Sequence, residues 1–329
     1  MKAVLCTHFG PPDELVIGEL PAPPMGPDEV RIRVDAAGVN FPDTLILQGK
    51  YQLKPPLPFA PGFEVAGTIT EVGARVTTRK LGDRVMALTS SGYGAFAEEA
   101  VAKAVETVAI PDDVDDATAT ALYTAYGTAY HALVQRGRLR AGQTLVVLGA
   151  SGGVGLAAVE LGAALGARVI AVGRSEAKLA LARARGAAEV IAYEEGTLGA
   201  RVKALAKDGA DVCIDMLGGT AFDAMSRAMA WEGRLLVVGF TSGVVPKLPV
   251  NLALLKGYEL VGVHWGSFVT RAPAANADNF TELARMLRAG TIRPHIGGRY
   301  SLDRVSAALT DLLGRRTAGK LVVIVGEGQ

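Results

Sequence analysis

Cysteine and histidine are scarce in this chain of 329 residues. There are two cysteines, Cys6 and Cys213, and four histidines. Two cysteines so far apart supply neither a disulfide framework nor a cysteine-based zinc site. The histidines are scattered, with no pair at ligand spacing on one helix, so the sequence predicts no metal centre. Cys213 lies in the apolar segment DVCID, which predicts a buried free thiol.

The chain also lacks an excess of charge and any long apolar run. It has 34 Lys and Arg against 33 Asp and Glu, which gives no basic field for nucleic acid or an anionic membrane. No apolar run approaches the ~20 residues that a membrane-spanning helix needs. His8, Gly10 and two prolines interrupt the start of the chain, so no signal peptide is expected. The sequence therefore predicts a cytoplasmic protein whose main partner is neither nucleic acid nor a membrane.

Half of the residues are hydrophobic, which is enough for sizeable cores, and the length favours two domains. The first 120 residues contain short alternating runs, such as 30–39 and 67–76, separated by Pro-rich segments. Alternation between apolar and polar residues is typical of half-buried strands, and Pro and Gly mark the turns between them. This part of the chain is expected to form a compact, mostly β domain.

From about residue 121 the pattern changes to alternating strands and helices. Six runs rich in Val, Ile and Leu are nearly unalternated, as expected of strands buried on both faces. They cover residues 144–149, 168–172, 189–192, 211–215, 234–239 and 259–263. Helices are expected between them at 153–165, 175–185, 198–207 and 220–231. The pattern predicts an α/β fold with a doubly wound, parallel, six-stranded sheet.

After residue 264 the pattern becomes irregular. Two amphipathic helices, at 280–288 and 305–313, and a closing strand at 321–325 are expected there. We expect this tail to return to the first domain. The predicted domains are therefore 1–120 with 265–329, and 121–264.

A glycine-rich loop follows the first strand of the predicted sheet. In GASGGVG, Gly152 and Gly153 permit positive φ and close approach to a pyrophosphate, and Gly155 permits tight packing of helix on strand. The N–H groups of the following helix suit phosphate. The spacing departs from strict G-x-G-x-x-G, and a structural strand-to-helix turn is the alternative. The predicted dinucleotide cradle consists of Ala150, Ser151, Gly152, Gly153, Val154 and Gly155.

The end of the second strand indicates which dinucleotide is bound. NAD sites usually place Asp or Glu there to bind the ribose, whereas this chain has Gly173, Arg174 and Ser175, with Lys178 one helical turn later. A guanidinium, a hydroxyl and an ammonium suit a 2′-phosphate. Solvated surface charges are the alternative, and Glu176 weakens the argument slightly. The sequence favours NADP(H).

These features together resemble the zinc-independent quinone oxidoreductase (zeta-crystallin-like) family of the medium-chain dehydrogenase/reductase superfamily. The segments that carry the resemblance are AAGVNFPDTLILQGKY, PGFEVAGTITEVG, GDRV, TAYHAL, GASGGVGLAA and GKLVV. The resemblance covers essentially the whole chain. It implies a GroES-like catalytic domain and a Rossmann domain, with a cleft between them.

The resemblance also implies chemistry without zinc. Alcohol dehydrogenases of this superfamily place a zinc-binding Cys where this chain has Asn40, and a zinc-binding His where it has Phe63. Asn does not replace a thiolate as a soft ligand, and Phe has no ligand atom. Zinc-assisted alcohol oxidation is therefore not expected.

Several site residues are carried over from the family. Asn40 and Tyr51 match residues that line the nicotinamide end of the cleft, with Tyr51 as a candidate proton donor. A turn residue and a loop anchor are the alternatives for them. Tyr193 matches a residue near the 2′-phosphate, and Lys178 matches a phosphate-binding lysine.

The remaining cofactor contacts lie further along the chain. Thr128, Gly239 and Phe240 are expected beside the cofactor. Lys320 is expected to close over the pocket, with a solvated lysine before an edge strand as the alternative. The resemblance further implies a homodimer formed through the apolar sixth strand.

The predicted activity is NADPH-dependent hydride transfer to a quinone in an apolar pocket lined by Leu53, Trp265 and Phe268. The runner-up is an enoyl-thioester or enone reductase, for which Arg271 and Arg293 are candidate contacts to a CoA-type substrate. The third hypothesis is an NADPH-binding protein with little turnover.

Overall fold

The computed structural model describes residues 1–326, and the chain forms two compact units. The first consists of residues 1–124, 269–280 and the segment that starts at 294, and the second consists of 125–268 and 281–293. The tail thus contributes to both units. The domain limits expected from the sequence stay a prediction.

The first unit is built around a seven-stranded sheet. Its strand order is β14-β15-β3-β4-β5-β7, and β6 pairs with β3. A separate two-stranded sheet contains β1 and β2. The strands of this unit are β1 (Lys2–Leu5), β2 (Val16–Glu19), β3 (Glu29–Val39), β4 (Glu64–Val72), β5 (Arg84–Leu88), β6 (Glu99–Lys103), β7 (Val108–Ala109), β14 (Ile296–Ser301) and β15 (Lys320–Ile324).

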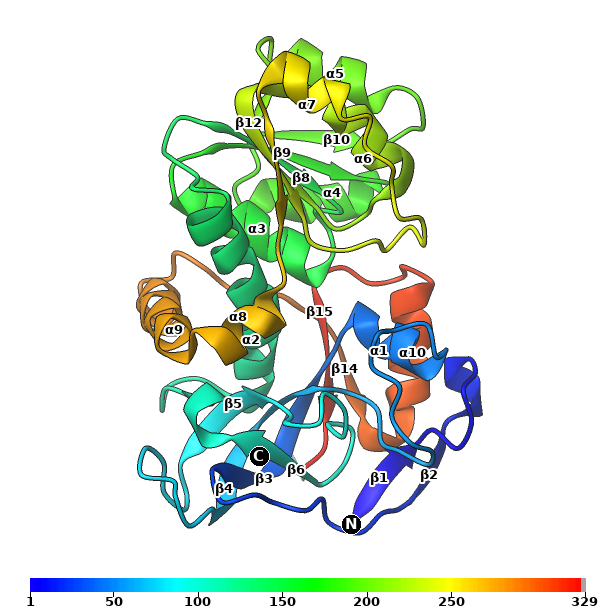
Figure 1. The fold of residues 1–329 in the computed structure, drawn as a ribbon, viewed down its shortest axis with the longest axis vertical. Helices are drawn as coiled ribbons and strands as arrows, with labels where there is room; N and C mark the ends of the chain where they lie inside the picture. The colour runs from blue at the N-terminus through cyan, green and yellow to red at the C-terminus, as the bar shows by residue number, and fades with distance from the viewer. Residues whose placement is uncertain (327–329) are drawn as a thin grey trace. The chain divides into compact units, whose positions relative to one another are not determined.

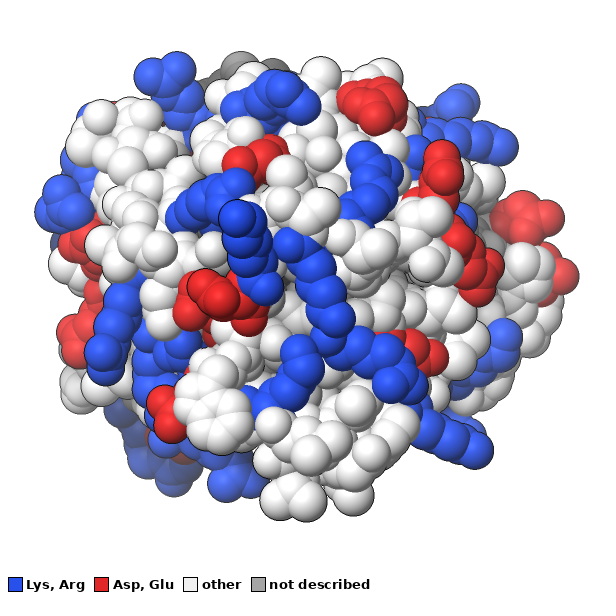
Figure 2. Space-filling model, turned by 90° about the horizontal axis from the view of Figure 1, so that it is seen from above, with Lys and Arg blue, Asp and Glu red and all other residues white. Residues whose placement is uncertain are grey.

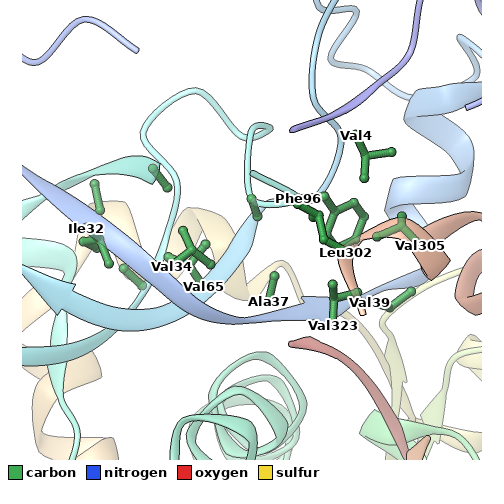
Figure 3. Packing of buried hydrophobic residues seen from close by; sticks show 14 of the residues in the cluster. Val4, Ile32, Val34, Ala37, Val39, Val65, Phe96, Leu302, Val305 and Val323 are labelled. Carbon is green, nitrogen blue, oxygen red and sulfur yellow. The ribbon is translucent and has the colours of Figure 1, made fainter. Parts of the chain in front are cut away.

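Short helices accompany this sheet, and its apolar face packs into one core. They are η1 (Pro12–Glu14), α1 (Phe41–Leu47), η2 (Ala104–Glu106), η4 (Leu302–Arg304) and α10 (Val305–Leu313). Figure 3 shows Val34 and Val39 of β3 in this core together with Val323 of β15 and Val305 of α10. The buried alternate residues of β3 match the alternating pattern in the sequence.

The second unit contains a parallel six-stranded sheet with the order β10-β9-β8-β11-β12-β13. Its strands are β8 (Thr144–Leu148), β9 (Arg168–Gly173), β10 (Glu189–Ala192), β11 (Ala210–Asp215), β12 (Met229–Val237) and β13 (Glu259–Gly262). The order reverses between β8 and β11, which is the switch point where such sheets bind ligands. The predicted fold class, a β-rich domain plus a doubly wound sheet, is confirmed.

Helices cover both faces of the second sheet. In Figure 1, α3 and α4 lie on one side of β8 and β9, and α5 and α6 lie on the other. The helices are α3 (Gly153–Ala164), α4 (Glu176–Ala184), α5 (Leu198–Leu205), α6 (Gly219–Ser226) and α7 (Asn251–Lys256). Apolar side chains of α5 and α6 pack on the strands in one core cluster.

Three further helices lie near the limits of the units. α2 (Asp116–Tyr130) continues into a π-helical segment, η3 (His131–Arg136), and α8 (Trp265–Arg271) precedes α9 (Pro273–Arg288). The irregular structure expected between residue 264 and the predicted helix over 280–288 is therefore wrong, because 265–271 is helical and α9 begins at Pro273. The predicted helix over 280–288 is found as the last part of α9. The helix predicted over 220–231 is also wrong at its C-terminal end. The observed helix, α6, ends at Ser226, and β12 begins at Met229.

Both cysteines are buried free thiols, as expected for Cys213. Within residues 1–326, no helix combines the length and the apolar character that crossing a bilayer requires.

Candidate functional site

The glycine loop turns directly at the end of β8. Gly149 has a φ of +77° and is therefore in the left-handed region that favours glycine. Its N–H and that of Ala150 both donate to the Val172 carbonyl of β9 at 3.0 Å. Gly152 and Gly153 permit a positive φ but do not adopt it, since Gly152 has a φ of −79° and Gly153 is helical. The chain reverses direction at the first residue after β8, so Gly149 is the residue of the loop that adopts the positive φ.

The start of α3 lies close against this turn. A Cβ at Gly155 would lie 2.1 Å from the Gly149 carbonyl oxygen, so only glycine permits this approach. At Gly152, the helix N-cap, a Cβ would meet only that oxygen, at 3.6 Å. Among the residues that the structure describes, no side chain caps the first N–H groups of α3. A pyrophosphate fits such a backbone cradle at a helix N-terminus.

Cationic side chains follow at the end of β9. Arg174 is exposed and forms no ion pair within residues 1–326, and Lys178 is half-buried in the first turn of α4. Tyr193, just after β10, donates its backbone N–H to the Gly173 carbonyl at 2.6 Å. The structure thus brings Arg174 and Tyr193, which were predicted separately, to one edge of the sheet. This set of donors fits a 2′-phosphate.

Thr220 is a candidate site residue that the sequence did not predict. Its Oγ1 lies 2.7 Å from the Tyr193 hydroxyl, so it fixes the orientation of the phenol at this edge. Thr220 lies in the first turn of α6, next to Gly218 and Gly219, both with positive φ. The glycine pair was the available signal, because such turns shape ligand-binding edges.

Asp215, at the end of β11, organises the neighbouring turn. Its carboxylate accepts the N–H groups of Leu217 (2.7 Å) and Gly218 (3.0 Å), and its backbone carbonyl accepts that of Gly239 (3.4 Å). Burial raises the pKa of Asp215 to about 6, although these hydrogen bonds lower it. Gly239 and Phe240 therefore lie at the carboxyl ends of the strands, where the sequence placed them.

In the first unit, Asn40, Glu64 and Lys320 form one buried polar network. Lys320 Nζ donates to Asn40 Oδ1 at 2.5 Å and to Glu64 Oε2 at 2.6 Å. Asn40 Nδ2 donates to the same Oε2 at 2.8 Å. Glu64 Oε1 accepts the Thr124 N–H at 2.7 Å. Glu64 is 0% exposed and Lys320 is 5% exposed. The alternative of a solvated lysine before an edge strand is wrong, since β15 pairs with both β14 and β3.

Asp43 is a second buried carboxyl beside this network. One oxygen accepts the Asn40 N–H at 2.7 Å, and the other has no hydrogen-bond partner within residues 1–326. Burial raises the pKa of Asp43 to about 8, against the lowering effect of that hydrogen bond. Burial also raises the pKa of the Tyr51 hydroxyl, and the charge of Asp43 raises it further. Both groups therefore hold their protons at neutral pH.

Replacing Asp43 by Asn should remove a pH dependence of stability. The carboxyl has a pKa of 3.8 in model compounds and about 8 in the folded chain, so the folded state binds the proton more tightly. The stability that this contributes is present at low pH and is lost as the pH rises towards 8. We expect the free energy of unfolding of the wild type to fall relative to Asp43→Asn by up to about 1.4 kcal/mol per pH unit between pH 5 and 8. Urea unfolding of both proteins from pH 5 to 9 measures this. A constant difference would contradict the raised pKa.

The other predicted site residues are distributed over the two units. Thr128 is buried in α2, and Trp265 is buried at the start of α8. Phe268 stacks on His131, with ring centroids 4.1 Å apart. Leu53 is half-buried and belongs to the first unit, whereas Trp265 and Phe268 belong to the second. The pocket role of these three residues stays a prediction.

Charges of both signs occupy the surface. Figure 2 shows Lys and Arg side chains interspersed with Asp, Glu and uncharged residues on the face seen from above. Arg271 and Arg293 are both exposed and belong to different units. Among the described residues, no three His, Cys, Asp or Glu side chains gather as metal ligands.

Comparisons with known proteins agree with this architecture. Residues 26–112 match the family model of the alcohol dehydrogenase GroES-like domain, and residues 153–285 match that of zinc-binding dehydrogenases. The chain is 37% identical to quinone oxidoreductase-like protein 2 of Rattus norvegicus over 324 residues, which cover 98% of this chain and 91% of the relative.

Two solved structures extend the likeness to the fold. A mycobacterial protein in complex with NADPH has a TM-score of 0.93 and 32% identity, with 98% of this chain and 100% of that chain covered. The quinone oxidoreductase of Escherichia coli in complex with NADPH has a TM-score of 0.91 and 25% identity, with 98% and 100% covered. The chain therefore belongs to the quinone oxidoreductase family of the medium-chain dehydrogenase/reductase superfamily.

Proposed function

We propose that the protein is a zinc-independent, NADPH-dependent reductase that transfers a hydride to a quinone. The observation that carries the proposal is the edge of the second sheet, where the glycine cradle lies beside Arg174, Lys178 and Tyr193. The donors there match the phosphates of NADPH, and two structures of similar proteins contain NADPH. Quinone is the acceptor named for several relatives.

The protein's residues bind and orient the reactants, and NADPH supplies the hydride when bound. The cradle at Gly149–Gly155 holds the pyrophosphate, and the cations at the end of β9 hold the 2′-phosphate. A quinone that accepts a hydride gains two electrons and one hydrogen, and it needs one more proton to become the hydroquinone. Tyr51, which stays protonated at neutral pH, is the proposed donor at its hydroxyl.

We infer that zinc has no part in this reaction. Asn40 and Phe63 occupy the positions of two zinc ligands in alcohol dehydrogenases of the superfamily. The Asn40 side chain is fully engaged with Glu64, Lys320 and the Gly38 carbonyl, and a phenyl ring has no donor atom. This donor set does not fit a catalytic zinc.

Steady-state oxidation of NADPH tests the proposal. The acceptors are 1,4-benzoquinone, 9,10-phenanthrenequinone and crotonyl-CoA, each repeated with NADH. Turnover of the quinones with preference for NADPH is the expected result. Turnover of crotonyl-CoA alone would make the protein an enoyl-thioester reductase. Tight binding of NADPH with no turnover of any acceptor would make it a binding protein.

A homodimer is the proposed assembly, and the edge strand β13 is the proposed contact. β13 pairs only with β12 within the described residues, and Leu260 on it is 48% exposed. Leu254 and Leu255 of α7 are 80% and 69% exposed. An apolar strand edge of this kind invites pairing with another chain.

Replacing Leu260 by Lys should therefore convert the dimer to a monomer. A charge on an apolar edge opposes pairing, so light scattering should show the mass fall from twice the chain's 34.1 kDa to the single value. Leu81→Lys is the matched control, because Leu81 is 64% exposed in the first unit. Equal masses for wild type and Leu260→Lys would rule out this contact.

A further inference from the structure

The buried network joins two predicted site residues, Asn40 and Lys320, to Glu64, which was not predicted. Asn40 directly follows β3, Glu64 lies at the start of β4 and Lys320 lies at the start of β15. Strand β3 lies between β15 and β4, so Glu64 and Lys320 come from strands on opposite sides of it. A carboxylate therefore reaches across a strand to meet an ammonium on the far side.

Gly38 makes this reach possible. It pairs with Glu64 in the register of β3 and β4, and a Cβ at this position would lie 2.0 Å from Glu64 Oε2. It would also lie 3.0 Å from Lys320 Cε. Gly38 does not have a positive φ, so it is space and not backbone conformation that requires glycine here.

The hydrogen-bond pattern assigns the donors. Both hydrogens of the Asn40 amide are used, by Glu64 Oε2 at 2.8 Å and by the Gly38 carbonyl at 3.2 Å. Lys320 Nζ has three hydrogens and two acceptors within residues 1–326. A buried ammonium with an unused N–H is unfavourable unless water or a ligand supplies the acceptor.

We propose that Glu64 is the positioning residue of the acceptor site, and that the Lys320 ammonium it holds meets the negative oxygen of the reduced acceptor. Glu64 balances the charge of the ammonium and fixes the direction of its remaining N–H. This inference rests on the proposed function.

Four variants separate positioning from simple charge balance. Glu64→Gln leaves the ammonium unbalanced, and Gly38→Ala displaces the carboxylate while every charge remains. Lys320→Met removes the donor, and the double variant Glu64→Gln with Lys320→Met removes both charges. Glu160→Gln is the matched control, since Glu160 is 6% exposed and pairs with Arg185 in the second unit.

The expected result is a drop in kcat of about a hundredfold in Glu64→Gln, Gly38→Ala and Lys320→Met, since small displacements of a reacting group have effects of that size. The KM for the quinone should change by less than kcat. The double variant should recover the melting temperature of the wild type but not its kcat, because the buried pair is replaced as a unit. Glu160→Gln should lower the melting temperature and leave kcat within about twofold of wild type, an effect of less than ~0.5 kcal/mol on the barrier.

Two outcomes would overturn the inference. One is kcat within twofold of wild type in folded Glu64→Gln and Gly38→Ala, and the other is recovery of kcat in the double variant. A wild type that reduces no acceptor removes the proposed function instead. Fluorescence titration with NADPH then tests whether Glu64 positions Lys320, because Lys320 is also a predicted cofactor residue. A roughly tenfold weaker affinity in Glu64→Gln, as one charge-assisted hydrogen bond would give, keeps the positioning role, and an unchanged affinity ends it.

Discussion

Replacing Arg174 and Lys178 by Ala together should raise the KM for NADPH by about a hundredfold and leave the KM for NADH within about threefold. A hydrogen bond to a charged group contributes about 1.5–3 kcal/mol, which is about tenfold or more for each side chain. NADH has no 2′-phosphate, so it gains nothing from either cation. Steady-state kinetics with both cofactors and 9,10-phenanthrenequinone measure the ratio.

Arg183→Ala is the matched control for this double variant. Arg183 is an exposed cation in the last turn of the same helix, α4, so its loss changes the net charge but not the end of β9. It should leave both KM values unchanged. Equal losses with NADPH and NADH in the double variant would show that the two cations do not bind the 2′-phosphate.

Strands and helices of the second unit were largely predictable because their signals are local. Runs of Val, Ile and Leu predicted strands whose limits differ from the observed ones by at most one residue for five of the six. In the first unit, the amphipathic helix predicted over 305–313 is found as α10. The exception is β12, which begins at Met229. The pair Glu232 and Gly233 interrupts its apolar run, so the first residues of the strand look like the end of a helix.

The network of Glu64 was beyond prediction from local patterns. Glu64 and Lys320 are 256 residues apart, and each is of a type that usually lies in solvent. The sequence reading used the neighbouring Phe63, because it replaces a metal ligand, and passed over Glu64. Only the pairing of β15 and β4 on either side of β3 brings the carboxylate and the ammonium together.

The glycine loop shows the same division between local and spatial information. Its place between strand and helix was evident from the sequence, and the tight packing at Gly155 follows from the family pattern. Which glycine takes the positive φ depends on where the backbone reverses. That reversal is fixed by the hydrogen bonds from Gly149 and Ala150 to Val172 of the neighbouring strand. The sequence of the loop alone does not contain them.

Gly155→Ala should destabilise the fold by about 3 kcal/mol and abolish the binding of NADPH. The three nearest atoms to the added Cβ all belong to backbone, at 2.1, 2.8 and 2.9 Å, so no side chain moves aside to make room. Helix α3 has to shift away from β8, which also moves the N–H groups that face the pyrophosphate. Urea unfolding and fluorescence titration with NADPH measure the two effects.

Gly152→Ala separates the effect of the glycine loop on stability from its effect on the binding of NADPH. Its Cβ meets one atom at an ordinary contact distance of 3.6 Å, and its φ of −79° suits any residue, so the free energy of unfolding should change by less than about 1 kcal/mol. A methyl group on a backbone that approaches a pyrophosphate should still weaken NADPH binding by about tenfold or more. Stable Gly152→Ala protein with undiminished affinity would mean that the loop is only a structural turn, because a phosphate cradle does not tolerate the methyl group.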